Sequence, residues 1–243
     1  ALYKNKFVGM HDGILYSLEY KDVNGCLAVD AIVKNTTSNV FIPKTGIKIY
    51  LGLNTYMDKF PEWNDIYFPT MLRCEKTHMT SYFMTPKGRI MLVASPDPIA
   101  SWENEYECQD MTVKGQKITH GLHRIYTSSY YLLHRLPLPT RHPQELFSLS
   151  PEEERCVRFF IKSVDNIENV QEEFYKLTDA PVLSADLYTI SENDIFNGKL
   201  WADDIKCLEV RTPRNEVDTL SLFKTGNDTY TWSYKPFSGK GEY

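Results

Sequence analysis

The chain has 243 residues, a formal net charge of −5 at pH 7, 42% hydrophobic residues and 24% charged residues. These values are ordinary for a globular protein, and they exclude the strongly basic surface with which proteins hold the phosphate backbone of a nucleic acid. No stretch approaches the about 20 apolar residues of a membrane-spanning helix, and no signal peptide begins at Ala1, so whether the chain is a piece of a longer protein stays open.

Alternation of apolar and polar residues dominates the first two thirds of the chain and predicts strands. Gly13–Lys21 and Cys26–Lys34 alternate around the Asn-Gly turn signal of 22–25, which predicts an antiparallel hairpin. Ser81–Thr85 and Arg89–Ser95 flank a Pro-Lys-Gly turn and predict a second hairpin. Further strands are expected at 47–51, 101–108 and 155–161.

One segment has a helical period. Over 166–177, an apolar stripe of Ile167, Val170, Phe174 and Leu177 predicts a short helix. Asp165 followed by Glu168 resembles a capping box, and the Asp-Ala-Pro sequence of 179–181 predicts its end.

After this helix, short strand patterns return with a turn about every ten residues, as in a small immunoglobulin-like sandwich. Residues 179–243 hold 11 Asp or Glu against 7 Lys or Arg, whereas the remainder is nearly balanced. We therefore expect an all-β chain: a large antiparallel, supersandwich-like β-sandwich at 1–165, a linking helix at 166–178, and a small immunoglobulin-like sandwich at 179–243. The strands expected in the small domain are Val182–Ile190, Ile205–Val210, Val217–Phe223 and Thr229–Tyr234, with turns at Asn197-Gly198, 213–215 and 225–228.

Cofactor and metal signatures are absent from the sequence. There is no glycine-rich phosphate loop and no nucleophile elbow, so no cofactor is expected. The His120-Gly-Leu-His123 pair lies on a strand pattern that turns the two rings to opposite sides, so no metal site is expected. We expect most of the cysteines to be buried free thiols, with one disulfide left open as an alternative; they are Cys26, Cys74, Cys108, Cys156 and Cys207.

Aromatic residues indicate a candidate carbohydrate-binding loop. The segment 56–67 combines aromatic rings, a proline and short polar side chains, a composition that suits stacking on a sugar face and hydrogen bonding to its hydroxyls. The alternative is a long connection whose rings pack into the sandwich edge. The predicted carbohydrate-binding residues are Tyr56, Trp63, Asn64, Tyr67 and His78.

Paired carboxylates give a weaker signal. Glu103 and Glu105 lie about 6.6 Å apart along one strand face, a separation compatible with a pair of glycosidase carboxylates. Any two residues separated by one position meet this distance, so a solvated outer face is the competing interpretation. Catalytic residues therefore stay unknown.

Four runs together resemble a known group of proteins. They are Tyr-Phe-Pro-Thr-Met-Leu-Arg-Cys-Glu-Lys-Thr-His at 67–78, Ser-Pro-Asp-Pro-Ile-Ala-Ser-Trp at 95–102, Leu-Pro-Leu-Pro-Thr-Arg-His-Pro at 136–143 and Leu-Ser-Pro-Glu-Glu-Glu at 149–154. This set resembles the N-terminal β-sandwich region of large bacterial glycan-degrading proteins of the six-hairpin (α/α)6 glycosidase type. The resemblance implies an accessory module outside the cytoplasm, periplasmic, cell-surface or secreted, whose partner is a glycan or an adjacent (α/α)6 catalytic domain.

Three functions remain open at this stage. The first is a non-catalytic module, substrate-presenting or structural, of a glycoside hydrolase that processes a polysaccharide. The second is a stand-alone carbohydrate-binding protein that uses Trp63. The third is a complete hydrolase or lyase with its site on the large sandwich, for which the candidate residues are Glu103, Glu105, His78, Tyr82 and His123.

Overall fold

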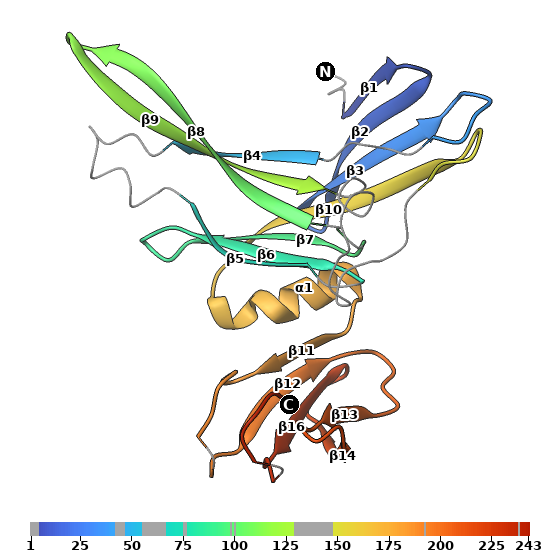
Figure 1. Ribbon diagram of the computed structural model, residues 1–243, viewed down its shortest axis with the longest axis vertical. Coiled ribbons are helices and arrows are strands. Elements are labelled where there is room, and N and C mark those ends of the chain that lie inside the picture. The colour runs from blue at the N-terminus through green and yellow to red at the C-terminus, as the bar shows by residue number, and fades with distance from the viewer. Residues whose placement is uncertain are drawn as a thin grey trace. The chain divides into compact units, whose positions relative to one another are not determined.

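The computed structural model describes residues 5–41, 47–54, 67–74, 77–97, 99, 101–128, 148–191, 193–237 and 239–243. The chain divides into two compact units, unit 1 at Ala1–Val170 and unit 2 at Gln171–Tyr243. Both contain antiparallel β-sheets, and the described part of the chain holds one short α-helix (Figure 1). The all-β fold class predicted from the alternation of residues is confirmed.

The described residues of unit 1 form two sheets. The larger has seven strands in the order β1-β2-β3-β10-β7-β6-β5, and the smaller has the order β4-β9-β8. Every pairing within them is antiparallel. The strands are β1 (Lys6–His11), β2 (Ile14–Val23), β3 (Cys26–Asn35), β4 (Ile47–Asn54), β5 (Phe68–Cys74), β6 (Met79–Met84), β7 (Ile90–Ser95), β8 (Ser101–Val113), β9 (Gln116–Ser128) and β10 (Glu154–Val164).

Tight turns set the register of the hairpins. Asn24 and Gly25, between β2 and β3, have φ of 54° and 75°, the left-handed pair that a two-residue hairpin turn requires. Both predicted hairpins, β2–β3 and β6–β7, are confirmed. The β1–β2 and β8–β9 hairpins were not predicted; they turn through Asp12-Gly13, with φ of 49° and 72°, and Lys114-Gly115, with φ of 50° and 79°.

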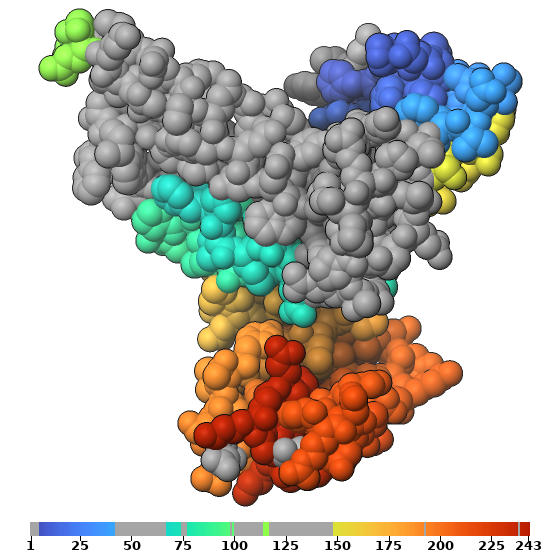
Figure 2. Space-filling view, viewed as in Figure 1, coloured from blue at the N-terminus to red at the C-terminus, as the bar shows by residue number. Residues whose placement is uncertain are grey.

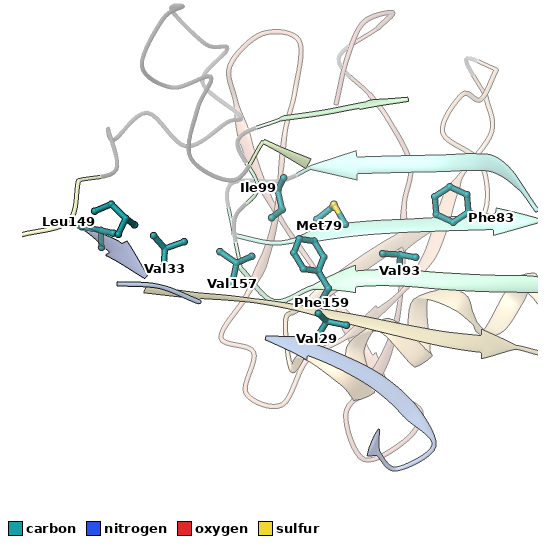
Figure 3. Packing of buried hydrophobic residues seen from close by; sticks show 10 residues of the cluster. Val29, Val33, Met79, Phe83, Val93, Ile99, Leu149, Val157 and Phe159 are labelled. Carbon is teal, nitrogen blue, oxygen red and sulfur yellow. The ribbon is translucent and has the colours of Figure 1, made fainter. Parts of the chain in front are cut away.

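The core of unit 1 lies on one face of the seven-stranded sheet. Figure 3 shows side chains from β3, β10, β6 and β7 meeting there, among them Val29, Phe159 and Phe83. Ile99 and Leu149, which lie outside the strands of this sheet, are also fully buried in the cluster. Full burial of such a side chain contributes about 1.5–3 kcal/mol, so this cluster stabilises unit 1.

A buried asparagine joins the end of β3 to the segment before β10. The Asn35 amide nitrogen donates to the carbonyl oxygens of Asn39 at 2.7 Å and Leu149 at 3.0 Å, and its oxygen accepts from the Thr37 backbone N–H at 2.9 Å. Asn35 is fully buried, and these hydrogen bonds satisfy its side-chain amide within the fold.

Unit 2 contains a four-stranded sheet, β11-β12-β16-β15, and a two-stranded sheet, β13-β14. Leu200 and Trp232 from the first sheet and Leu220 from the second are buried in one cluster, so the two sheets share a core. The strands are β11 (Val182–Ala185), β12 (Phe196–Trp201), β13 (Leu208–Arg211), β14 (Val217–Leu220), β15 (Leu222–Lys224) and β16 (Thr229–Tyr234).

Three expectations about unit 2 are wrong. The predicted turn at Asn197-Gly198 lies inside β12, where Gly198 pairs with Ala185 and Trp232. The strand expected over 217–223 is two strands in different sheets, separated at Ser221. The strand expected from Val182 ends at Ala185, just before a last backbone bond from the Asp186 N–H to the Asn197 carbonyl.

The predicted helix is present, but its cap differs from the prediction. A 3-10 turn at Ile167–Asn169 leads into α1 (Val170–Thr178). The N-cap is Asn166, whose side chain accepts from the Glu168 backbone N–H, and not Asp165. Val170 and Phe174 are buried as the apolar stripe predicts, whereas Ile167 is exposed.

The cysteines only partly follow the prediction. Cys26, Cys156 and Cys207 are free, yet only Cys26 is buried. The expectation of buried thiols is therefore wrong for Cys156 and Cys207, which lie at exposed positions.

Candidate functional site

The predicted carbohydrate-binding residues fall into two groups. Tyr56, Trp63 and Asn64 lie outside the described residues. Tyr67 and His78 are described, and they lie at opposite ends of the β5–β6 hairpin, because β5 follows Tyr67 directly and β6 follows His78. A strand of seven residues spans about 23 Å, so these two side chains do not contact the same sugar ring.

Tyr67 forms an aromatic and cationic corner with Arg89. The Arg89 guanidinium carbon lies 5.9 Å from the centroid of the Tyr67 ring, within the range of a cation–π interaction. The Tyr67 side chain is half-buried and packs against the core of unit 1. We call these two residues the Tyr67–Arg89 corner.

The turn between β6 and β7 positions Arg89. Its backbone N–H donates to the Thr85 hydroxyl at 3.1 Å, and its carbonyl accepts from the Thr85 backbone N–H at 2.9 Å. A ring stacked on a guanidinium offers an apolar face beside a fixed positive charge, which suits the C–H face of a sugar and a neighbouring oxygen or carboxylate. Arg89 was predicted only as the start of a strand, since its approach to Tyr67 depends on the pairing of β5 with β6.

The other candidates do not form a single site. The His78 Nδ1 atom lies 2.9 Å from the Thr77 hydroxyl, and Tyr82 is a half-buried residue of β6. Glu103, Glu105 and His123 are described by backbone position alone, and these strand positions pair with Tyr126, Arg124 and Tyr106, respectively.

An ion-pair ladder crosses the face of the large sheet opposite the core. The strand register places Lys6, Glu19, Asp30 and Arg158 side by side on β1, β2, β3 and β10. Lys21 lies diagonally between Glu19 and Asp30 and bonds to both carboxylates, at 3.2 and 2.8 Å. We call these five residues the charge ladder.

Asp30 is the buried centre of the charge ladder. Its side chain is 4% exposed, and the Arg158 guanidinium binds both carboxylate oxygens, Nε to Oδ1 at 2.5 Å and Nη2 to Oδ2 at 2.8 Å. Hydrogen bonds from Arg158, and secondarily from Lys21, lower the pKa of Asp30 from its usual 3.8 to about 2. Asp30 is therefore ionised at neutral pH and does not act as a proton donor; its arrangement is that of a structural ion pair.

The charge ladder makes stability depend on pH. Because the pKa of Asp30 is lower in the folded state than in the unfolded chain, its contribution is complete above about pH 4 and is lost as the pH falls toward 2. We expect a loss of about 2 kcal/mol from this residue over that range. Urea unfolding of the wild type and Asp30→Asn at several pH values measures it, with Asp165→Asn, an exposed position, as control. If the free energies of unfolding of the wild type and Asp30→Asn differ by the same amount from pH 7 to 2.5, the prediction is contradicted.

The described ranges contain no group of three or more His, Cys, Asp or Glu placed to hold a metal ion. In the same part of the chain, no helix is both long and apolar enough to cross a membrane.

The fold is that of an all-β protein with a large and a small unit. The sequence of the chain matches no protein-family model and no curated protein with which it was compared. Among solved structures, it is similar to a polysaccharide lyase of Bacteroides, with a TM-score of 0.60 and 8% sequence identity. The match covers 98% of this chain and 33% of the lyase, so the chain spans about a third of the length of that protein. At this identity, the similarity shows a shared fold.

Proposed function

We propose that this chain is a non-catalytic, substrate-presenting β-module of a larger bacterial protein that processes a polysaccharide outside the cytoplasm. One observation carries the proposal: nearly the whole chain, with both of its units, has the fold of one third of a polysaccharide lyase. A fold shared over both units favours a common modular arrangement over the chance likeness of a single sandwich. The catalytic groups are then expected in a separate domain of the parent protein.

The similarity also bears on the class of the parent enzyme. The sequence resemblance implies a glycoside hydrolase with an (α/α)6 barrel, whereas a solved structure with a similar fold is a lyase. We therefore propose a polysaccharide-processing enzyme as the parent and favour a lyase. Release of reducing ends by the isolated chain, from any of a panel of polysaccharides, would overturn the non-catalytic role.

We further propose that the glycan strand contacts the Tyr67–Arg89 corner. Trp63 and Asn64 precede Tyr67 by four and three residues in the sequence, so the predicted aromatic loop leads directly into the corner. Tyr56 belongs to the same loop, and His78 would contact a more distant sugar of the same strand. The support is the ring–guanidinium pair at the start of β5.

Aromatic substitutions test this contact. Trp63→Ala and Tyr67→Ala are each expected to raise the dissociation constant for a bound polysaccharide about two- to tenfold, because a stacked aromatic contact contributes about 0.5–1.5 kcal/mol. Affinity electrophoresis on a panel of polysaccharides identifies the bound glycan and measures the change.

The control is Tyr188→Ala, which removes a tyrosine that is 70% exposed in unit 2. Since Tyr67 also packs on the core, Tyr67→Phe is a second variant that keeps the ring and the packing. Wild-type affinity in both Trp63→Ala and Tyr67→Ala would reject this placement of the glycan.

A further inference from the structure

Unit 2 has a pocket of about 250 Å³ where β12 begins and β16 ends. Figure 2 shows the C-terminal residues, in dark red, on the surface of this unit. Aromatic rings and amine or amide side chains alternate among the lining residues, which include Asn193, Phe196, Lys235, Phe237, Lys240 and Tyr243.

Packed rings and a closed loop form the wall of the pocket. The Tyr243 ring lies 5.9 Å from the Tyr234 ring and 6.5 Å from the Phe196 ring, centroid to centroid, and the Tyr243 hydroxyl donates to the Gly239 carbonyl at 2.7 Å. Gly241 lies so close to Pro213 that an added Cβ would be 2.5 Å from the proline ring. The last residues are therefore held against unit 2 by specific contacts.

Tyr234, which packs against Tyr243, is fixed by a hydrogen bond to Asp218. Its hydroxyl donates to the Asp218 carboxylate at 2.9 Å, and burial together with this carboxylate raises the pKa of Tyr234 to about 12. Because the Tyr234 hydroxyl already donates to Asp218, the polar groups that can bind a ligand in the pocket are those of the lining residues.

The pocket concentrates positive charge on an acidic unit. Residues 179–243 carry 11 acids and 7 bases, yet Lys235 and Lys240 both line this one pocket. Within the described ranges neither ammonium group has an ion-pair partner. The nearby Asp194 carboxylate accepts a hydrogen bond from the Ser191 backbone N–H at 3.1 Å. Two lysines beside exposed Phe237, which is 64% exposed, present charge next to an apolar ring face.

We propose that this pocket binds a uronate, a sugar ring that carries a carboxylate, within a glycan strand. The lysine ammonium groups pair with the carboxylate, an aromatic ring covers the C–H face of the sugar, and Asn193 bonds to a hydroxyl. A volume of about 250 Å³ is below the roughly 300 Å³ at which pockets for drug-sized ligands begin, so one sugar ring enters. This inference rests on the proposed function in that it takes the ligand to be a glycan.

Glucuronic acid and glucose test the proposal, since they share a ring and differ by a carboxylate against a hydroxymethyl group. The full chain is titrated with each sugar and followed by amide shifts in a ¹⁵N–¹H spectrum. Glucuronate is expected to shift the amides of residues 193–197 and 234–243, with a dissociation constant at least tenfold lower than that of glucose. The double variant Lys235→Ala/Lys240→Ala is expected to weaken glucuronate binding about tenfold, since two charge-assisted contacts are lost. The matched control is Lys199→Ala/Lys206→Ala, which makes the same charge change at exposed positions of unit 2 outside the pocket.

Three results would overturn the proposal. They are equal binding of glucose and glucuronate, no shift of these amides, or perturbation by acetate as strong as by glucuronate, which would make the pocket a general anion site. The outcome is separable from that of the proposed function, because the Trp63 and Tyr67 variants and the turnover assay do not involve this pocket.

Discussion

Arg158→Ala is expected to lower the free energy of unfolding of unit 1 by about 3 kcal/mol. The change removes both hydrogen bonds of the guanidinium and leaves the Asp30 carboxylate, 4% exposed, on the sheet face with less compensation. Breaking a buried ion pair by removing one partner typically costs 3–5 kcal/mol. We expect the lower end of this range because the Arg158 side chain is 45% exposed and Lys21 still bonds to Asp30 at 2.8 Å.

The measurement is hydrogen exchange of the β3 and β10 amides, which reports on unit 1 separately from unit 2. Arg155→Ala is the matched control: the two arginines of this strand are similarly exposed, but the Glu153 partner of Arg155 is 35% exposed where Asp30 is 4%, and we expect a loss below 1 kcal/mol. Asp30→Asn/Arg158→Ala should be more stable than the sum of the two single changes predicts, because it leaves no uncompensated charge. A loss below 1 kcal/mol for Arg158→Ala would show that solvent screens the pair as it screens a surface pair.

The charge ladder shows what local sequence patterns omit. The alternation in 26–34 and 155–161 predicts both strands, and the structure confirms them. Yet Asp30 and Arg158 are 128 residues apart, and their contact depends on the pairing of β3 with β10. No hairpin turn joins these two strands, so no turn sets their register. The Tyr67–Arg89 corner is missed for another reason: it joins the first residue before β5 to the turn before β7, and so depends on the registers of two successive hairpins together. Pairs made within a hairpin are open to sequence reasoning, whereas pairs across distant strands require the sheet order.

The small unit shows a different limit. Its strands are short, and the Asn-Gly dipeptide of β12 has the composition of a hairpin turn. In the structure, Gly198 is required for close packing: the Trp232 indole and the Ser184 carbonyl occupy the space that a Cβ would need, and the Trp232 Nε1–H donates to the Lys199 carbonyl at 3.4 Å. A glycine in a strand therefore marks either a turn or a close approach, and only the partner across the sheet distinguishes the two.

Gly198→Ala is consequently expected to destabilise unit 2 by about 3 kcal/mol. An added Cβ would lie 2.0 Å from the Ser184 carbonyl oxygen and 2.6 Å from Trp232 Cζ2, so the strand backbone and the indole must both move. Overpacking of this kind costs about 1–3 kcal/mol, and a clash with backbone puts it at the upper end. A unit of about 70 residues has a total stability of roughly 4–10 kcal/mol, so the variant loses a large fraction of it. Hydrogen exchange of the β12 and β16 amides measures the loss.

Gly9→Ala is the matched control, because Gly9 lies in β1 and an added Cβ there meets no atom within 4 Å. This change is expected to be neutral or to stabilise by up to about 1 kcal/mol, since alanine reduces the freedom of the unfolded chain. Gly198→Ala/Trp232→Phe separates the two contacts, because the smaller ring relieves the contact with the indole but not the one with the Ser184 carbonyl. Gly198→Ala is therefore expected to cost less stability in the Trp232→Phe background than in the wild type, but still to cost some. If Gly198→Ala costs no more than Gly9→Ala, then β12 does not pack against β11 and Trp232 in solution as described, and the pocket formed by Phe196 at its start would lose its structural basis.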